Sequence, residues 1–492
     1  MILYGANIGV EEGPQNGGHS FDYESAKYAN RKDPNHASAN LDASEITNQI
    51  SADLDKGRIT LLTDKEKAFV SPQGLAPKHD GGYRRIHDLS WPRDQSVNDL
   101  IPKEHATLSY ATFDGIVEGI KAAGPNAFII KGDVKSAFRI VPVSLSQRWL
   151  LAFQWHENRY RENCLPFSLR TAPYLFNLFA EALHWLILKK LAEAGLSEVK
   201  VHHYLEDYIS IIPHDMLHAV HRVAELWIQV TDELGMPRND KKDVQGTTAE
   251  ILGIKVDTIA MIAILSVEKT RRILHLLQST LDGGHYNLEC TDSLAGHLTW
   301  AAKVVDAGRG FTVGLYAFIA AFRSNTAIPR RLPGEVKQDL QWWSNALKFH
   351  NGTRVIMDSN LRRAHLFRDA SNLALGAYWH FEDDVSLCDE RAFAILRHDN
   401  EHINTAEVQA IKIAFTAWSE HWTGCQVTVH TDSSAAFGGL SKQRSFSHRR
   451  IGLGAGCATD DEQDKEVGDG EKDAASAESQ AACGIDVESF RR

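Results

Sequence analysis

The sequence predicts an α+β protein of several domains, because regions with different hydrophobic patterns follow one another along its 492 residues. Residues 61–260 alternate short apolar strands with amphipathic helices, residues 261–355 are helical, and residues 360–447 return to strands and a helix. Residues 1–60 are polar, and residues 448–492 lose all apolar periodicity. We therefore expect an N-terminal extension, two mixed regions separated by a helical one, and an acidic disordered tail.

Within the first part of the chain, residues 1–40 show no firm periodicity and are expected to be loosely ordered. Ile46, Ile50, Leu54 and Ile59 then follow at close to helical spacing. Further along, we expect a buried strand at 128–130 leading to Asp133, a strand at 149–155, a helix opened by Pro173, a strand–turn–strand at 201–212 with its turn at Glu206-Asp207, a helix at 218–234 and a strand at 251–256.

The second half is predicted to be helical over 266–350. A strand is expected at 363–379, a helix at 405–422, and a strand at 427–429 leading to Asp432. After about Ser447 the residues Ala, Gly, Ser, Asp and Glu dominate, which predicts disorder over 450–492.

Bulk composition excludes some classes of protein. The chain is 43% hydrophobic and 24% charged, as expected of a globular protein, and no apolar run approaches the ~18 residues that span a bilayer. The six cysteines are scattered without a C-x-x-C pair, so neither a zinc site nor a disulfide framework is predicted from them. With a first segment unlike a signal peptide, we expect an intracellular protein, cytoplasmic or nuclear, that is not secreted.

The net charge of −11 argues against a nucleic-acid-binding protein. However, residues 457–492 hold 11 acidic and 4 basic side chains, so most of the excess negative charge lies in this tail. A basic groove elsewhere is compatible with the composition, because the local field steers nucleic acid.

Two short segments carry the first chemical signal: Asp133 ends a β-branched run, and Glu206-Asp207 lies between two apolar runs 74 residues later. Phosphoryl transfer to a hydroxyl uses two divalent ions ~3.5–4 Å apart, and Mg²⁺ prefers carboxylate oxygens on rigid mounts such as strand ends. Taken singly, Asp133 could instead cap a helix, and Glu206-Asp207 could form a polar turn.

The order and surroundings of these acids resemble the reverse transcriptase family. Six motifs match in sequence: Lys78–Ser90 as a fingers hairpin, Asp133–Phe138 as the first palm motif, Leu165–Pro173 as the loop and helix beneath the template–primer, Tyr204–Asp207 as the Y-x-D-D hairpin, Gly235–Lys242 as the next motif, and Ile251–Ile254 as the primer-gripping region.

The resemblance implies a right-hand polymerase of fingers, palm and thumb that extends a DNA primer on an RNA template with dNTPs. It places Mg²⁺ (or Mn²⁺) on Asp133, Glu206 and Asp207. It also gives nucleotide-binding roles to four further positions. These are Lys78 and Arg84 on the triphosphate, Phe138 against the sugar, and Lys241 or Lys242 as an acid to the pyrophosphate. Solvated hairpin charges, a core aromatic and a surface lysine are the alternative interpretations of these residues.

Two positions depart from the family pattern. Glu206 stands where the family has its first hairpin aspartate, and Ser168 stands where it usually has glycine. The longer carboxylate would displace an ion by roughly a bond length, and a shift of ~1 Å can cost about 10²-fold in rate. A catalytically impaired retroelement remnant, or a module that only binds nucleic acid, is therefore the alternative to an active enzyme.

A second set of acids recurs in the last mixed region. Asp369 follows one strand, Glu407 lies in a helix, and Asp432 ends another strand. This order resembles RNase H, which implies an α/β domain that cleaves the RNA of RNA–DNA hybrids with divalent metal on these three residues. The family's C-terminal carboxylate has no clear counterpart, so the domain is expected to be truncated or altered there; Asp486 is a weak candidate.

The helical region between the two resemblances offers a finer one. Leu294–Leu298, Ala307–Arg309 and Asp339–Trp343 resemble the connection of DIRS-type tyrosine-recombinase retrotransposons. This assignment, or a fragment of another retroelement, fits the chain. Oligomeric state, template and primer identity are left open.

Overall fold

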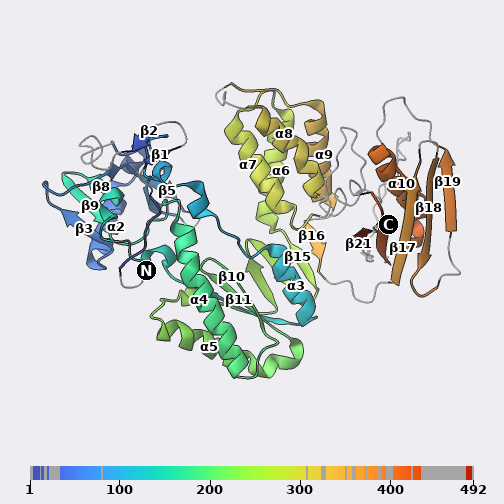
Figure 1. Cartoon of the computed structure of the whole chain (residues 1–492), viewed down its shortest axis with the longest axis horizontal. Helices are drawn as coiled ribbons and strands as arrows, with labels where there is room; N and C mark the ends of the chain where they lie inside the picture. Colours follow the sequence, from blue (N-terminus) through green and yellow to red (C-terminus); the bar gives the residue numbers. More distant parts are fainter. Residues whose placement is uncertain are drawn as a thin grey trace, which may run out of the picture. The chain divides into compact units, whose positions relative to one another are not determined.

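The computed structural model describes residues 4–10, 13–15, 19–21, 34–78, 81–305, 308–322, 328–349, 352–356, 362–371, 374–384, 389–394, 403–422, 425–433 and 484–489. They divide into two compact units, Met1–Ala249 and Glu250–Arg492, and each is described by itself (Figure 1). Within these ranges no helix is both long enough and apolar enough to cross a bilayer.

The first unit begins with a small α/β region. Its elements are the β1–β2 hairpin (Gly13–Gln15, His19–Phe21), η1 (Ala37–Asn40), α2 (Ala43–Asp55), the sheet β3-β9-β8-β4 (Ile59–Leu62, Asn158–Glu162, Ala152–Trp155, Val70–Ser71) and the β5–β6 hairpin (Gln73–Pro77, Tyr83–His87). Asp42 caps α2 by accepting a hydrogen bond from the Glu45 amide. Ile46 and Ile50 are buried, which confirms the amphipathic helix for these two residues, whereas Leu54 is exposed and Ile59 lies beyond the helix in β3.

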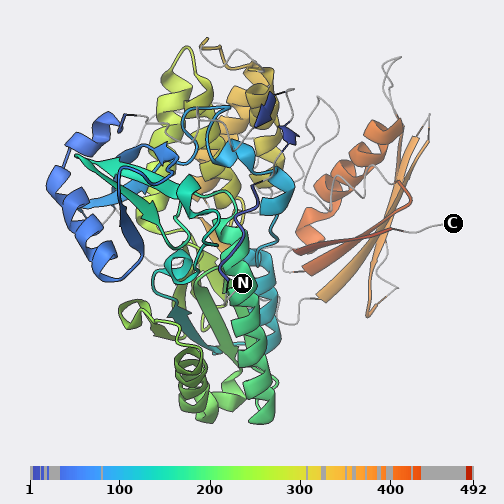
Figure 2. The ribbon, with the colours of Figure 1, turned by 60° about the vertical axis from the view of Figure 1, so that its left-hand side comes forward.

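The central sheet of this unit has the order β10-β11-β7-β12, with every neighbouring pair antiparallel (Lys200–Tyr204, Asp207–Ile212, Phe128–Asp133, Val244–Gly246). Three helices pack on it: α3 (Phe113–Ala123), α4 (Ala172–Glu193) and α5 (Val220–Glu233). Tyr208 of β11 contacts both α4 and α5, whereas α3 lies on the opposite face, where Gly119 approaches His202 (Figures 1 and 2). A Cβ at Gly132 would lie 2.6 Å from the Trp227 ring, so glycine permits α5 to approach β7.

Short 3-10 helices complete the first unit. They are η2 (Asn98–Leu100), η3 (Lys103–Ala106), η4 (Ala137–Ile140), η5 (Arg148–Leu151), η6 (His214–Ala219) and η7 (Asp240–Lys242). The predicted strand at 149–155 is wrong in its first half, because η5 occupies it and only Ala152–Trp155 forms β8.

A predicted turn and a predicted strand also differ in detail. The β10–β11 turn is formed by Leu205 and Glu206, with Leu205 at φ 52°, and Asp207 already belongs to β11. The predicted strand at 251–256 is a hairpin instead, because β13 (Thr248–Ile251) turns at Leu252-Gly253 into β14 (Ile254–Asp257). Both turn residues have positive φ, 47° and 78°, as the tightest hairpins require.

In the second unit, a small sheet of order β13-β14-β15-β16 (β15 Ile262–Ile264, β16 Thr353–Val355) accompanies a helical region. The helices are α6 (Val267–Asp282), α7 (Leu288–Ala301), η8 (Gly308–Thr312), α8 (Val313–Ala321) and α9 (Gly334–Phe349). They lie side by side in Figure 1, with Trp343 fully buried. The prediction of a helical region over 266–350 is confirmed for its described residues.

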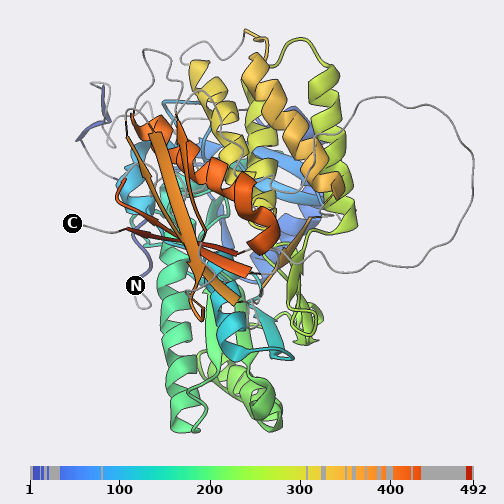
Figure 3. The same cartoon turned by 90° about the vertical axis from the view of Figure 1, so that its right-hand side faces the viewer.

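The same unit holds a five-stranded sheet of order β19-β18-β17-β20-β21 (Asp389–Ala394, Ala374–Phe381, Arg362–Ala370, Cys425–Thr431, Gly484–Ser489). β17, β20 and β21 are parallel, and β18 and β19 are antiparallel to their neighbours. Helix α10 (Ile403–Trp418), followed by η10 (Ser419–Trp422), lies along one face of the sheet (Figure 3), and Leu366, Trp379 and Trp418 are buried in this domain.

The predicted disorder of the tail is wrong for Gly484–Ser489, because these residues pair with β20 in parallel. The tail therefore returns to the sheet at 484–489. The other tail residues of that prediction, and most of the predicted loose N-terminal segment, lie outside the described residues.

Candidate functional site

The sheet of the first unit brings the three predicted acids to one end. Asp133 is the last residue of β7, Asp207 is the first of β11, and the two stand directly opposite each other in the antiparallel register. Glu206 lies in the adjoining turn, and its carbonyl accepts a hydrogen bond from the Val134 amide at 2.9 Å. Two sequence segments 74 residues apart thus place their carboxylates on neighbouring strands, as strand pairing at this register dictates.

Lysines neutralise part of this negative charge. Lys242 Nζ lies 3.1 Å from Asp133 Oδ2, and Lys131 Nζ lies 3.3 Å from Asp207 Oδ2. Burial raises the pKa of Glu206, and repulsion from Asp207 and Asp133 adds to the rise. Asp133 is only 3% exposed, so the excess negative charge lies in a place where water screens it poorly. A divalent cation would relieve this repulsion.

The carboxylates of the three acids are not close enough together to bind one ion as they stand. In the part of the chain that the structure describes, groups of three potential ligand atoms within 4.8 Å of one another occur at Asp369, Glu407 and Asp432 and at Glu181, His184 and His203, but not at Asp133, Glu206 and Asp207. The all-carboxylate donor set fits Mg²⁺ or Mn²⁺. Its closure on an ion requires small movements of these side chains, with Lys242 displaced from Asp133.

The sequence did not indicate two of the residues that support this site. Lys131 lies two residues before Asp133 on the same face of β7, a spacing that could have pointed to it. Tyr110 stacks on Tyr204 of the hairpin, with ring centroids 4.8 Å apart. No local pattern marks Tyr110, because only the fold brings it to β10.

The predicted nucleotide-binding residues lie on three different elements. Lys78 and Arg84 are exposed on and beside the β5–β6 hairpin, and the Arg84 guanidinium lies 5.7 Å from the centroid of the Phe167 ring. Phe138 in η4 is 6% exposed, and its ring centroid lies 5.0 Å from that of Phe167. Phe138 is therefore held in the core, and the exposed Phe167 joins it to Arg84.

Of the two candidate lysines, only Lys242 contacts an acid of the site among the described contacts. Lys241, beside it in η7, is exposed and forms no ion pair with a candidate acid among the described contacts. The structure thus distinguishes two residues that the sequence left equivalent.

Ser168 fits its surroundings. Its hydroxyl donates to the His87 carbonyl, and its own carbonyl accepts from the Asn98 amide group at 2.8 Å. Ser168 is not among the residues with positive φ. Its backbone therefore does not require glycine, and the side chain that departs from the family pattern is anchored by a hydrogen bond.

The second predicted set of acids is brought together in the five-stranded sheet. β17 and β20 are parallel, so Asp369 near the end of β17 and Asp432 just after β20 lie at the same edge. Glu407 reaches them from α10 and is 8% exposed. One ligand atom from each acid lies within 4.8 Å of the others, a separation that fits binding of divalent metal.

Arg368 belongs to this cluster, although the sequence analysis did not select it. Its side chain is fully buried and forms an ion pair with Glu407. Burial lowers the pKa of Arg368 to about 10, opposed by Asp432 and Asp369. The signal in the sequence was a charged residue at an inward strand position, in alternation with Ala364 and Leu366.

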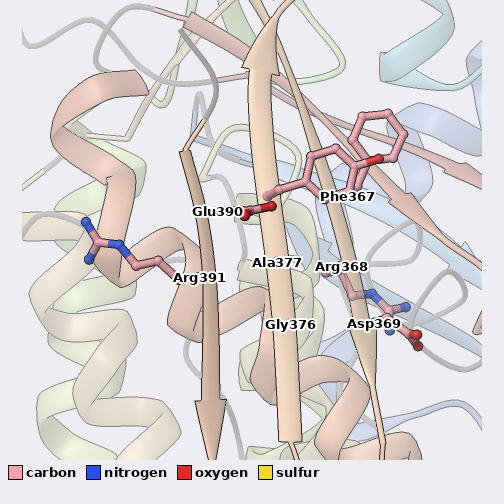
Figure 4. Close-up of a pocket in the computed structure, with 8 residues that line it drawn as sticks. Phe367, Arg368, Asp369, Gly376, Ala377, Glu390 and Arg391 are labelled. Carbon is pink, nitrogen blue, oxygen red and sulfur yellow. The ribbon is translucent and has the colours of Figure 1, made fainter.

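A groove of about 490 Å³ adjoins this cluster. Figure 4 shows Arg368 and Asp369 on β17 and Glu390 and Arg391 on β19, with β18 between them. The groove is therefore lined by charged groups of both signs.

The comparisons with known proteins agree with this geometry. Residues 76–256 match the sequence profile of the family described as reverse transcriptase (RNA-dependent DNA polymerase). No curated protein matches the chain. Among solved structures, the foamy viral protease-reverse transcriptase dRH in complex with double-stranded DNA is 16% identical with a TM-score of 0.52, covering 82% of this chain and 65% of its own.

A second structure of the foamy viral protease-reverse transcriptase, also in complex with double-stranded DNA, is 16% identical with a TM-score of 0.52, over 85% of this chain and 79% of its own. At this level of identity the two similarities concern the fold alone. Residues 76–256 are thus similar in sequence to the reverse transcriptase family, and the fold of the chain is similar to that of the foamy viral protease-reverse transcriptase.

Proposed function

We propose that the chain is an RNA-directed DNA polymerase that extends a DNA primer with dNTPs. The observation that carries the proposal is the direct pairing of Asp133 with Asp207, with Glu206 beside them, inside the region that matches the family. Two divalent ions, Mg²⁺ or Mn²⁺, would be held by these three carboxylates and would activate the primer hydroxyl and stabilise the leaving pyrophosphate.

The surrounding residues suit the binding of a nucleotide. Lys78 and Arg84 are exposed cations on one hairpin, where they can contact phosphate oxygens. Phe138 presents a fixed, rigid wall because Phe167 and Phe176 pack around its ring. Lys242 is placed to supply positive charge or a proton near Asp133.

Replacement of Asp133 by asparagine tests the polymerase. We expect primer extension on an RNA template with Mg²⁺ or Mn²⁺ to fall by about 10–100-fold or more, because the amide removes the buried ligand charge. Incorporation of labelled dNTP into a primer measures this. Asp215→Asn, at an exposed position of η6, is the matched control and should leave incorporation unchanged. Measurable incorporation that is equal in wild type and Asp133→Asn would exclude the proposed site.

A second activity, cleavage of RNA in RNA–DNA hybrids, is favoured by the close set of Asp369, Glu407 and Asp432. Glu407→Gln should reduce hybrid cleavage by about 10–100-fold, because it removes a ligand charge while preserving the side-chain volume. Gel analysis of a labelled RNA strand in a hybrid measures cleavage, and Glu420→Gln, exposed on η10, serves as control. Cleavage that survives Glu407→Gln at the wild-type rate would rule out this triad.

The DIRS-type assignment stays a prediction. Its residues Leu294, Leu298 and Trp343 are buried, and a Cβ on Gly308 would lie 2.5 Å from the Trp343 ring. The pattern that suggested this assignment is therefore a packing pattern of the helical region. A catalytically impaired remnant is the alternative to an active polymerase. The substitution Glu206→Asp distinguishes between these two possibilities.

A further inference from the structure

Three side chains between α4 and β10 face one another and take no part in either candidate active site. Glu181 and His184 lie one turn apart on α4, His203 lies on β10, and one ligand atom of each is within 4.8 Å of the others. His203 is 8% exposed, and the Tyr208 ring stacks on it with centroids 5.5 Å apart. The cluster is therefore held in place by packing.

The contacts of His203 require more ring protons than a neutral imidazole carries. His184 Nε2 lies 3.1 Å from the Val201 carbonyl, which requires a proton on that nitrogen and leaves His184 Nδ1 as an acceptor. His184 Nδ1 faces His203 Nδ1 at 3.1 Å. His203 Nε2 faces Asn177 Oδ1 at 3.3 Å and a Glu181 oxygen at 3.6 Å. Both ring nitrogens of His203 thus face acceptors.

Without an ion, removing this conflict requires a flip of the Asn177 amide together with a movement of Glu181 away from it. Asn177 Nδ2 lies 3.3 Å from Glu181 Oε1, so a flipped amide would turn its oxygen toward that carboxylate. A second proton on His203 would satisfy both contacts, but it would place a charge on a ring that is only 8% exposed. A cation between the two histidines would remove the need for that proton.

We propose that Glu181, His184 and His203 form a Zn²⁺ site. Two imidazole nitrogens and one carboxylate are a donor set that zinc accepts, with a water as fourth ligand. For Zn–N bonds of about 2.0–2.1 Å, the edge of a tetrahedron is about 3.3 Å, close to the 3.1 Å between the two Nδ1 atoms.

The outer contacts fit the same assignment. With zinc on the Nδ1 atoms, His184 Nε2 donates to the Val201 carbonyl and His203 Nε2 donates to Asn177 Oδ1, the type of outer hydrogen bond that orients ligating histidines. The Glu181 side chain is 58% exposed, so it has room to turn toward the ion.

The position of the site suggests what the ion does. His203 directly precedes Tyr204 in β10, the strand that leads into the turn containing Glu206. Zinc would fasten this strand to α4 and hold the hairpin that carries the candidate acids. The ion would act on the position of the strand, and its binding can be measured whether or not the chain is a polymerase.

Zinc binding by the full-length chain tests the proposal directly. ZnCl₂ is titrated in competition with a chromogenic chelator, and Co²⁺ is used to record the visible absorption of tetrahedral coordination. His184→Gln and Glu181→Gln should each weaken the tightest zinc site by at least about tenfold and remove the Co²⁺ band. Both substitutions keep a polar side chain of similar length.

His221→Gln is the matched control, because His221 and Glu225 form a helical His–Glu pair on α5, 87% and 48% exposed, that belongs to no three-ligand group among the described residues. This variant should bind zinc as wild type does. Asp369→Asn in every protein tested removes competition from the other three-ligand group.

Thermal unfolding gives a second measurement. Zinc should raise the unfolding midpoint of the wild-type chain and leave that of His184→Gln unchanged, since a ligand that binds only the folded state stabilises it. Equal zinc affinity in wild type, His184→Gln and Glu181→Gln would overturn the proposal. Binding of Cu²⁺ or Ni²⁺ without binding of Zn²⁺ would overturn the identity of the metal.

Discussion

Replacing Glu162 by glutamine is expected to destabilise the first unit by about 3–5 kcal/mol, because it leaves two buried arginines short of an anion. Glu162, in β9, is 1% exposed. Its carboxylate oxygens lie 2.7 Å from Arg139 Nη1 and 3.3 Å from Arg85 Nη2. Asp53 of α2 is the other acid of the network. One of its carboxylate oxygens lies 3.1 Å from Arg85 Nη2 and 3.3 Å from Arg139 Nη2.

The pH dependence of this effect has a definite sign. Burial alone would raise the pKa of Glu162, but Arg139, Arg85 and His87 outweigh it and hold that pKa well below its ordinary value of 4.5. A carboxylate with a lowered pKa stabilises the fold above the unfolded value and loses this contribution as the pH falls below it. The difference in stability between wild type and Glu162→Gln should therefore be constant near neutral pH and shrink below pH ~4.5.

Thermal or urea unfolding followed by tryptophan fluorescence measures this difference, and the loss corresponds to a midpoint lower by roughly 6–20 °C. Glu193→Gln is the matched control. Its partner Lys189 lies 3.8 Å away, both side chains are 53% exposed, and a surface pair of this kind contributes about 0–1 kcal/mol. An equal effect of the two substitutions would contradict the assigned role of the buried network.

This network connects the β5–β6 hairpin to α2, β9 and η4. Arg85 belongs to β6, next to Arg84, and Arg139 belongs to η4, next to Phe138. The two predicted nucleotide-binding residues thus neighbour the two arginines that Glu162 and Asp53 hold together. Loss of the network would displace both Arg84 and Phe138. Glu162→Gln should therefore lower primer extension as well as stability.

The sequence predicted the local elements of the first site because strands and turns have short-range signals. The apolar residues before Asp133 and the two apolar runs around Glu206-Asp207 sufficed to place all three strands. The pairing of Asp133 with Asp207 was implied only by the family resemblance, because the register of strands far apart in sequence depends on the packed sheet.

The charged partners of the sites were not predictable in the same way. Lys131, Arg368 and Glu162 each meet partners from other elements, so strand alternation can mark the positions of Lys131 and Arg368 but cannot identify the residues that they pair with. The hairpin at Leu252-Gly253 was missed for a different reason. A continuous apolar run predicted one strand, although the glycine could have signalled the turn.

Glu206→Asp is expected to raise primer extension by about 10²-fold, the change that a shift of ~1 Å in a reacting geometry can produce. Glu206 sits in a tight turn whose Leu205 has φ 52°, so its backbone has little freedom to retreat from an ion. Burial raises the pKa of Glu206, and repulsion from Asp207 and Asp133 adds to the rise, so a cation beside this carboxylate would favour its charged form. A shorter side chain would place its oxygens nearer the strand ends, where Asp133 and Asp207 lie.

The comparison of three substitutions separates the effect of side-chain length from the effect of charge. Glu206→Gln keeps the length and removes the charge, so it should give no gain, and Glu193→Asp repeats the shortening at an exposed position of α4 without effect on extension. If wild type binds template–primer but incorporates nothing, and Glu206→Asp incorporates, the natural chain is an impaired polymerase with an intact fold. If wild type incorporates well and Glu206→Asp loses activity, the longer carboxylate is a working ligand, and the geometry of this site has adapted to it.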